Sequence, residues 1–444
     1  MTQPSNPGLR HLQASDWRAA SLLATQATHA VIAMTEGVHQ AVWRTLGAPS
    51  GATPAQTRGL TGLIYKSIHA TTQRVGQGVY TALSRLEPLL QRLHSQGEDS
   101  PERLAFVSAL NGVMGDRLQA SSNPLTMPMT LRYQELQAHV SKGLEPDLAR
   151  KDQSPNARPK LLLVLHGLCM NDLQWTTQHQ GRVVNHAHAL AQALGYTPVF
   201  VRYNTGLHVS DNGQQLAAQL QRLVAQWPVP VTELTVLAHS MGGLVMRSAV
   251  HVADQATEPP GMGWRGLLKN MVFLGTPHHG APLERLGNWV DVVLGSTPYS
   301  RPFAKFGQLR SAGVTDLRYG LVQPSDWQGQ DRFQRQPDPR TPLPLPHNVA
   351  CFTLAACAAT QRSVLAERLL GDGLVPLHSA LGQHPEPSRQ LHFAPSHQAV
   401  LYRTNHMQLL SSPQVTKQLL RWLAPVTDSA APLDSDTFSA PPRT

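Results

Sequence analysis

Short apolar runs alternate with helical patterns from Lys160 onward, and this alternation constrains the fold more than any other feature of the sequence. The runs cover residues 161–165, 197–203, 234–238, 271–274 and 349–355. Runs of this length suit strands that are buried on both faces, and intervening helices are the crossovers that parallel strands require. The sequence therefore predicts an α/β fold with a mostly parallel sheet and helices on both faces.

The first 143 residues have a different pattern, in which apolar residues recur at helical spacing. One such face runs from Leu60 to Leu86, a second segment covers residues 16–46, and a third opens at Ser100-Pro101-Glu102. Serine at an N-cap and proline in the first turn are typical helix starts. We therefore expect a helical region over residues 1–143.

The remaining segments follow from their composition. Residues 144–160 are polar, contain proline and lack periodicity, so they are predicted to be a linker to an α/β domain of residues 161–424. Residues 281–347 lie between two predicted strands and are rich in Pro, Arg and Trp, which indicates a lid-like insertion. The tail, residues 425–444, has the composition of a disordered segment.

Charge and cysteine content exclude several classes of function. The 37 Lys and Arg exceed the 28 Asp and Glu, but the basic residues are scattered, which argues against nucleic-acid binding. The three cysteines, Cys169, Cys351 and Cys357, have no metal-ligand spacing and are expected to be buried and free. No signal peptide and no run of 18 apolar residues is evident, so a cytoplasmic location is expected.

The most informative motif joins a predicted strand to a predicted helix. Residues 234–238 lead into His239-Ser240-Met241-Gly242-Gly243, and a helical pattern follows. A small residue two positions before and after a serine permits the strained turn that exposes a nucleophile at the top of a sheet. Ala238 stands where glycine is usual, a mild departure because both residues are small. This turn predicts Ser240 as a nucleophile.

A second motif follows the first strand of the domain. Residues 161–165 run into His166-Gly167-Leu168. An acyl-transfer enzyme stabilises its oxyanion with two backbone N–H groups, one after the nucleophile and one after an early strand. Met241 and Leu168 would provide them, although His166-Gly167 could also be an ordinary turn at a strand end.

The acid and the base should follow the nucleophile along the chain. Asp372 lies between two glycines after the predicted strand 349–355, with Asp291 and Asp316 as weaker candidates inside the insertion. His406 follows the apolar run 399–402 and opens the last helical pattern. The rival bases are His392 and His397, and an ordinary Asp-Gly turn and a surface histidine are the plain alternatives.

The segment Gly275-Thr276-Pro277-His278-His279-Gly280 follows the strand after the nucleophile helix. Two adjacent histidines could indicate zinc, but they point in different directions and no Cys or carboxylate has ligand spacing. We therefore expect no metal, and a rigid loop beside the substrate cleft. The candidates to line this cleft are His166, Gly167, His239, Thr276 and His278.

Together these motifs resemble a known family. HGL, AHSMGG, FLGTPHHGAP, GDGLVP and NHMQLL, over residues 161–423, are similar to lipases and esterases of the α/β-hydrolase superfamily, especially bacterial proteins like the GPI inositol-deacylases. The resemblance implies carboxylic-ester hydrolysis by Ser240, Asp372 and His406, with Leu168 and Met241 as oxyanion donors and no cofactor. The implied partner is an ester or lipid substrate.

Two alternatives remain open. The same triad could serve an acyltransferase or thioesterase, because the sequence hardly separates water from another acyl acceptor. The N-terminal helices could also bind a membrane, a storage granule or a partner, although amphipathic helices more often simply pack on a domain. The sequence does not indicate an oligomeric state.

Overall fold

The computed structural model describes residues 101–133, 157–256, 263–281, 310–333, 337–359 and 371–425. The chain divides into two units, residues 1–103 with 118–126 and residues 104–117 with 127–444. The sheet and all the candidate site residues that the structure describes belong to the second unit.

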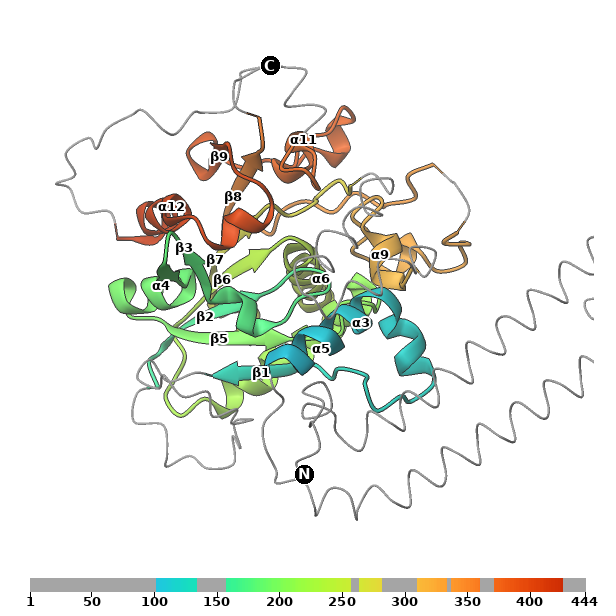
Figure 1. The fold of residues 1–444 in the computed structure, drawn as a ribbon, viewed down its shortest axis with the longest axis horizontal. Helices are drawn as coiled ribbons and strands as arrows, with labels where there is room; N and C mark the ends of the chain where they lie inside the picture. Colours follow the sequence, from blue (N-terminus) through green and yellow to red (C-terminus); the bar gives the residue numbers. More distant parts are fainter. Residues whose placement is uncertain are drawn as a thin grey trace, which may run out of the picture. The chain divides into compact units, whose positions relative to one another are not determined.

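A mostly parallel sheet forms the centre of the second unit, as the apolar runs predict (Figure 1). Within the described residues its strand order is β1-β5-β2-β6-β7-β8-β9. Neighbouring strands are parallel except for β1, which is antiparallel to β5. A separate antiparallel pair joins β3 to β4. The strands are β1 (Thr130–Tyr133), β2 (Lys160–Leu165), β3 (Thr177–His179), β4 (Arg182–Val184), β5 (Thr197–Arg202), β6 (Glu233–His239), β7 (Leu268–Leu274), β8 (Ala350–Cys357) and β9 (Gln398–Tyr402).

The helices connect and cover these strands (Figure 1). The described α-helices are α3 (Pro101–Ala120), α4 (His186–Leu194), α5 (Val209–Gln226), α6 (Met241–Gln255), α7 (Trp264–Leu267), α9 (Ala312–Asp316), α11 (Leu377–Ala380) and α12 (Pro413–Leu423). Short 3-10 turns are η2 (Asp172–Trp175), η4 (Pro324–Asp326), η5 (Pro387–Arg389), η6 (Pro395–His397) and η7 (Met407–Leu410). The 3-10 turns and the shortest helices lie in the segments that follow the strands, where the candidate site residues also occur.

Side chains of the central strands belong to two separate hydrophobic cores, one on each face of the sheet. Successive strand residues point to opposite faces, so Leu161, Leu163 and Leu165 pack with α5 and α6. Leu162 and Val164 pack with α4 and α12 on the other face. Both cores are closed to solvent at these strands, which explains why the runs carry so few polar residues.

The N-terminal and insertion segments differ in part from the sequence expectation. Helix α3 begins at Pro101, where the third helix was expected, but residues 130–133 form β1 and add an antiparallel edge to the sheet. The two earlier predicted helices, most of the linker and residues 426–444 of the tail lie outside the described residues. The described parts of the insertion, 310–333 and 337–347, contain α9 and η4. Because β7 and β8 are neighbours, the insertion is an excursion between paired strands.

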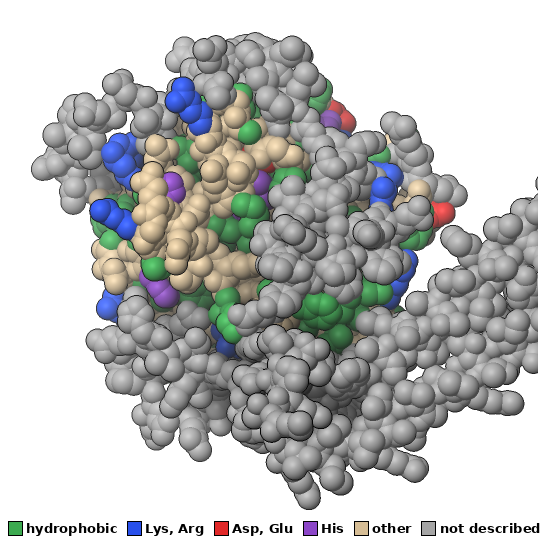
Figure 2. Space-filling view, viewed as in Figure 1, with side chains coloured by type: hydrophobic (Ala, Val, Ile, Leu, Met, Phe, Trp, Pro, Cys, Tyr) green, Lys and Arg blue, Asp and Glu red, His purple; other side chains and the backbone are tan. Residues whose placement is uncertain are grey.

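The described surface and cysteines agree with the composition. On the face shown in Figure 2, the Lys and Arg side chains of the described residues lie at separate places and do not gather into one basic patch. Cys169, Cys351 and Cys357 are buried and form no disulfide. In the described part of the chain we find no helix whose length and hydrophobicity would let it span a bilayer.

A matched pair of valine substitutions tests the central position of β6. Val236 is fully buried in the larger core, whereas the Val183 side chain on β4 is 69% exposed. We expect Val236→Ala to lower the free energy of unfolding by about 2 kcal/mol, because it removes two buried methyl groups and leaves a cavity. Val183→Ala should change it by less than about 0.5 kcal/mol. Urea denaturation followed by fluorescence measures both, and equal losses would contradict this assignment of the core.

Candidate active site

Ser240 lies at the sharp turn where β6 ends and α6 begins. Its backbone has φ 55° and ψ −125°, a conformation that residues with a Cβ rarely adopt. The Ser240 N–H donates to the Leu274 carbonyl at the end of neighbouring β7, at 2.8 Å. The Ser240 hydroxyl is buried and has no hydrogen-bond partner among the described residues. The turn thus holds a serine in a strained conformation with its Oγ available for chemistry.

Two glycines allow this turn to approach the end of β2. A Cβ added to Gly167 would lie 3.0 Å from the Cβ of Ser240 and 3.2 Å from Nδ1 of His239. A Cβ added to Gly242 would lie 2.7 Å from the His166 carbonyl oxygen. The distance at Gly242 is too short for a side chain, and at Gly167 a side chain would fit only if its neighbours moved by a few tenths of an ångström, so glycine permits close packing at both positions. The loop after β2 is therefore held directly against the serine.

Two backbone N–H groups lie on either side of this contact. Leu168 follows Gly167, and Met241 is the first residue of α6. Both residues are fully buried, and within the described residues neither N–H donates to a backbone or side-chain acceptor. The first-turn amides of a helix carry partial positive charge. The Met241 N–H therefore carries partial positive charge, and the Leu168 N–H is a second donor without an acceptor among the described residues.

His406 and Asp372 form a buried hydrogen-bonded pair. Nδ1 of His406 donates to Oδ2 of Asp372 at 2.6 Å, and both side chains are 1% exposed. The other carboxylate oxygen accepts from the N–H groups of Leu374 and Val375, at 2.9 and 2.7 Å. The backbone N–H of His406 also donates to the backbone carbonyl of Asp372 at 3.1 Å. The acid therefore fixes both the ring and the backbone of His406.

Contacts from the serine turn reach the same histidine. Nε2 of His239, the residue before Ser240, donates to the His406 carbonyl at 3.3 Å, and the two rings lie 4.7 Å apart. A Cβ added to Gly275, which follows β7 with φ +57°, would lie 3.1 Å from Nδ1 of His406. His406 is thus enclosed by the residues that flank the serine turn on β6 and β7.

The other cleft candidates act as buried supports. The His166 ring stacks on Tyr203 with centroids 4.4 Å apart, and the Tyr203 hydroxyl donates to the His166 carbonyl at 2.7 Å. Burial lowers the pKa of His166 to about 4 and that of His239 well below its usual value. Thr276 is buried, and its hydroxyl and methyl groups lie against Gly243 of α6. Near neutral pH both histidines are therefore uncharged beside the serine turn.

His278 is placed differently from the other candidates. Its buried ring packs edge-on against Phe273, with centroids 4.8 Å apart, and lines a cavity that does not include Ser240 or His406. Among the described residues no group of three or more His, Cys, Asp or Glu side chains is arranged to hold a metal ion. His278 and His279 thus belong to a separate structural cluster.

The rival acids and bases have other roles where the structure describes them. Asp316 pairs with His208 at 2.9 Å and accepts from the Val209 N–H, far along the chain from the serine turn. His397 faces the Cys351 carbonyl at 3.2 Å through Nδ1, and the His392 side chain is exposed. Asp291 lies outside the described residues. Of the described rivals, none pairs with Asp372 or Ser240.

Sequence reasoning missed the support that α3 gives to the loop after β2. A Cβ added to Gly112 would lie 2.9 Å from Cα of Cys169, and one added to Gly115 would lie 2.7 Å from Cγ of Asn204. The Cys169 N–H donates to Thr205 Oγ1 at 3.0 Å. Two glycines three residues apart inside a helical pattern were the available signal, since glycine is unfavourable there without a packing reason.

A protein family matches the part of the chain that contains Ser240. Residues 155–298 match the model of a family described as "Putative serine esterase (DUF676)". No curated protein matches the chain.

Several solved structures are similar over much of the chain. The mature lipase BlEst2 of Bacillus licheniformis is 18% identical, with 61% of this chain and 93% of that chain covered and a TM-score of 0.37. The esterase Pf2001 of Pyrococcus furiosus is 14% identical, with 60% and 81% covered and a TM-score of 0.33. An esterase of Pyrobaculum calidifontis is 14% identical, with 60% and 74% covered and a TM-score of 0.31.

The matched segment contains the loop after β2, the strained turn at Ser240 and the end of β7. These are the elements that the motifs HGL, AHSMGG and FLGTPHHGAP occupy. Residues 155–298 are thus similar to a serine-esterase family, and this matched segment includes Ser240.

Proposed function

We propose that Ser240, His406 and Asp372 form a catalytic triad that hydrolyses carboxylic esters through an acyl-enzyme. The observation that supports this assignment best is the buried 2.6 Å hydrogen bond between His406 and Asp372, enclosed by the residues that flank the strained Ser240 turn. A serine hydroxyl is a weak nucleophile near neutral pH and needs an oriented base. The pair supplies that base and fixes its tautomer.

The proposed reaction has two steps, acylation of Ser240 and hydrolysis of the acyl-enzyme. Ser240 Oγ attacks the ester carbonyl carbon while Nε2 of His406 takes the hydroxyl proton, and this proton then goes to the departing alkoxide as the ester C–O bond breaks. Water next attacks the acyl-enzyme, gives its proton to Nε2 and releases the carboxylic acid, and Ser240 regains its proton. Asp372 accepts from Nδ1 throughout and stabilises the imidazolium.

The N–H groups of Leu168 and Met241 are the proposed oxyanion hole. Their burial and the lack of any acceptor among the described residues leave them available for the oxyanion that forms in each step. A single donor of this kind is worth about 10²–10³ in kcat. The same triad could also transfer the acyl group to an alcohol or cleave a thioester. Product analysis with added alcohol separates hydrolysis from acyl transfer.

Removing the Ser240 hydroxyl tests the nucleophile directly. We expect Ser240→Ala to abolish the mass increase that a fluorophosphonate adds to the intact protein, and to lower kcat on p-nitrophenyl butyrate by about 10⁴-fold or more. The matched control is Ser248→Ala, because Ser248, which lies on α6, is likewise a buried serine whose hydroxyl lacks a hydrogen-bond partner among the described residues. Labelling that persists in Ser240→Ala would refute the assignment.

Replacing the acid by its amide tests the His406 pair. In Asp372→Asn the side-chain oxygen can still accept from Leu374 and Val375, but the NH₂ group then faces Nδ1 and forces the wrong tautomer of His406. We expect kcat to fall by about 10⁴-fold with the fold retained. Asp316→Asn, at the rival acid, should leave kcat within about tenfold of wild type, and a reversed order of the two variants would assign the acid to Asp316 instead.

A methyl group at Gly167 tests the contact between the loop and the serine turn. Its Cβ would lie 3.0 Å from Cβ of Ser240, so Ser240 and Leu168 must shift apart by a few tenths of an ångström. We expect Gly167→Ala to lower kcat by about 10- to 100-fold, because misplaced catalytic groups lose transition-state contacts. Gly266→Ala on α7, where an added Cβ meets nothing within 4 Å, is the control. Unchanged kcat in both variants would show that the loop does not position the oxyanion.

A further inference from the structure

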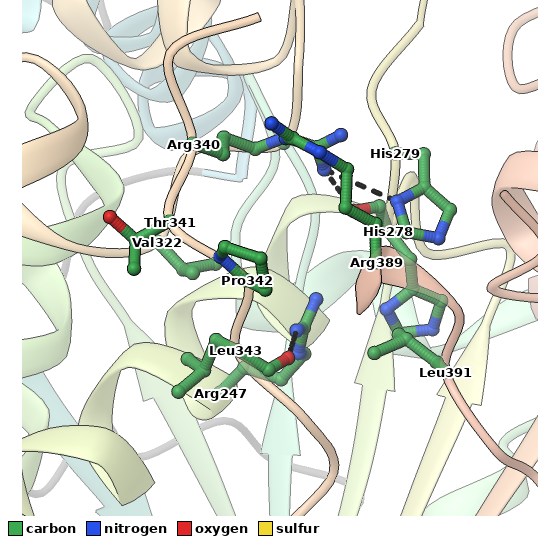
Figure 3. Close-up of a pocket in the computed structure, with 11 residues that line it drawn as sticks. Arg247, His278, His279, Val322, Arg340, Thr341, Pro342, Leu343, Arg389 and Leu391 are labelled. Atoms are coloured by element: carbon green, nitrogen blue, oxygen red, sulfur yellow. Dashed lines mark hydrogen bonds between the residues drawn. The ribbon is translucent and has the colours of Figure 1, made fainter. Parts of the chain in front are cut away.

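A small cavity lies beside α6, away from the proposed triad. Its volume is about 20 Å³, and its lining includes Arg247, His278, His279, Arg340 and Arg389. Figure 3 shows the Arg247 guanidinium and the His278 ring at one side of the cavity, with the Arg340 and Arg389 side chains approaching from the opposite side. No carboxylate belongs to the described lining. The titratable side chains of the lining are therefore all cationic or imidazole groups, and the other lining residues are uncharged.

The charge of Arg247 has no partner at close range. The side chain is buried, Nη2 donates to the Leu343 carbonyl at 2.6 Å, and Nε has no acceptor among the described residues. Burial, followed by repulsion from Arg340, lowers its pKa to about 10, so Arg247 still carries its charge near neutral pH. Burial of an unpaired charge is costly.

The carboxylates of Asp326 and Asp338 already have other hydrogen-bond or ion-pair partners. Asp326 attracts Arg247, but its carboxylate accepts from the N–H groups of Val322, Gln323 and Thr341 and forms no ion pair with Arg247 within 4 Å. Asp338 pairs with Arg340 and Arg389, at 2.6 and 2.9 Å. Arg247 is thus the uncompensated cation in this part of the described structure.

His278 adds a second unmet polar group. Its ring is fully buried, and neither ring nitrogen has a hydrogen-bond partner among the described residues. Phe273 and Phe393 pack on the ring with centroids 4.8 and 5.5 Å away, so the ring is fixed in place. A neutral imidazole offers one N–H donor. His278 and Arg247 together offer at least two donors without acceptors at the wall of one cavity.

We propose that this cavity binds one small monovalent anion, of the size of chloride, between Arg247 and His278. A volume of about 20 Å³ exceeds what a single water-sized occupant needs. A water molecule could accept from the same donors, but it would leave the Arg247 charge uncompensated. An anion satisfies the donors and the charge together.

The bound anion would join three segments of the fold. Arg247 lies on α6, His278 follows β7, and Arg340 holds the His278 carbonyl with a 2.9 Å hydrogen bond from the insertion. Binding to the folded state alone stabilises it by mass action. The proposal concerns stability and is independent of ester hydrolysis, so loss of one does not bear on the other.

Bromide provides a probe that can be located and titrated. In wild-type protein, raising sodium bromide against sodium gluconate at constant ionic strength should raise Tm by about 3 °C in a saturable way. Crystals soaked in sodium bromide should show an anomalous peak within hydrogen-bond distance of Nε of Arg247. Absence of the peak together with equal Tm values in the two salts would overturn the proposal.

Two variants and one control assign the response to the cavity. Arg247→Gln should lose the bromide-dependent rise in Tm, whereas Arg265→Gln should keep it, because Arg265 pairs with Asp254 at an exposed site on α7. If Arg247→Gln does not fold, His278→Phe is the second variant, since its neighbours are aromatic, and it should weaken the apparent bromide affinity at least tenfold. A full bromide response in either folded variant would overturn the assignment.

Discussion

The positive-φ backbone of Ser240 is the constraint on which the rest of the site depends. A non-glycine residue held in such a conformation costs about 1–3 kcal/mol and persists only where its surroundings determine it. Those surroundings are the Leu274 carbonyl, which accepts from the Ser240 N–H, and the close approach of Gly167 and Gly242. A larger residue at either glycine would push β2 and α6 apart. The serine, the loop after β2 and the end of β7 are consequently positioned as one unit.

The parallel sheet brings Asp372 and His406, which are distant in sequence, to this unit. Asp372 lies in the connection from β8 to β9, and His406 follows β9, so both occur beyond the carboxyl ends of strands. Carboxyl ends of parallel strands meet at one edge of a sheet, where α/β folds place their sites. The order β6-β7-β8-β9 therefore converts a long separation in sequence into contact. His239 and Gly275 close that contact around His406.

Local patterns predicted the features that local physics determines. Buried parallel strands need continuous apolar runs, and the turn at Ser240 needs small neighbours, so β2, β5, β6, β7 and β8 could be read from the sequence. Strand β1 could not, because residues 130–133 are half polar and pair at an edge inside a helical pattern. The packing of Gly112 on Cys169 and the cluster of Arg247 with His278 depend on tertiary contacts between segments far apart in sequence.

Burial has opposite consequences for the two histidines near Ser240 and for Arg247 on α6. Around Ser240 it lowers the pKa of His166 and His239, so near neutral pH neither ring carries a charge that would oppose an imidazolium on His406. Arg247, on the same helix, cannot respond in this way, because a pKa of about 10 still leaves it charged. A buried histidine can become neutral, whereas a buried arginine needs a counter-charge. The difference explains why the histidines around Ser240 need no counter-charge, whereas Arg247 needs one, which the proposed anion would supply.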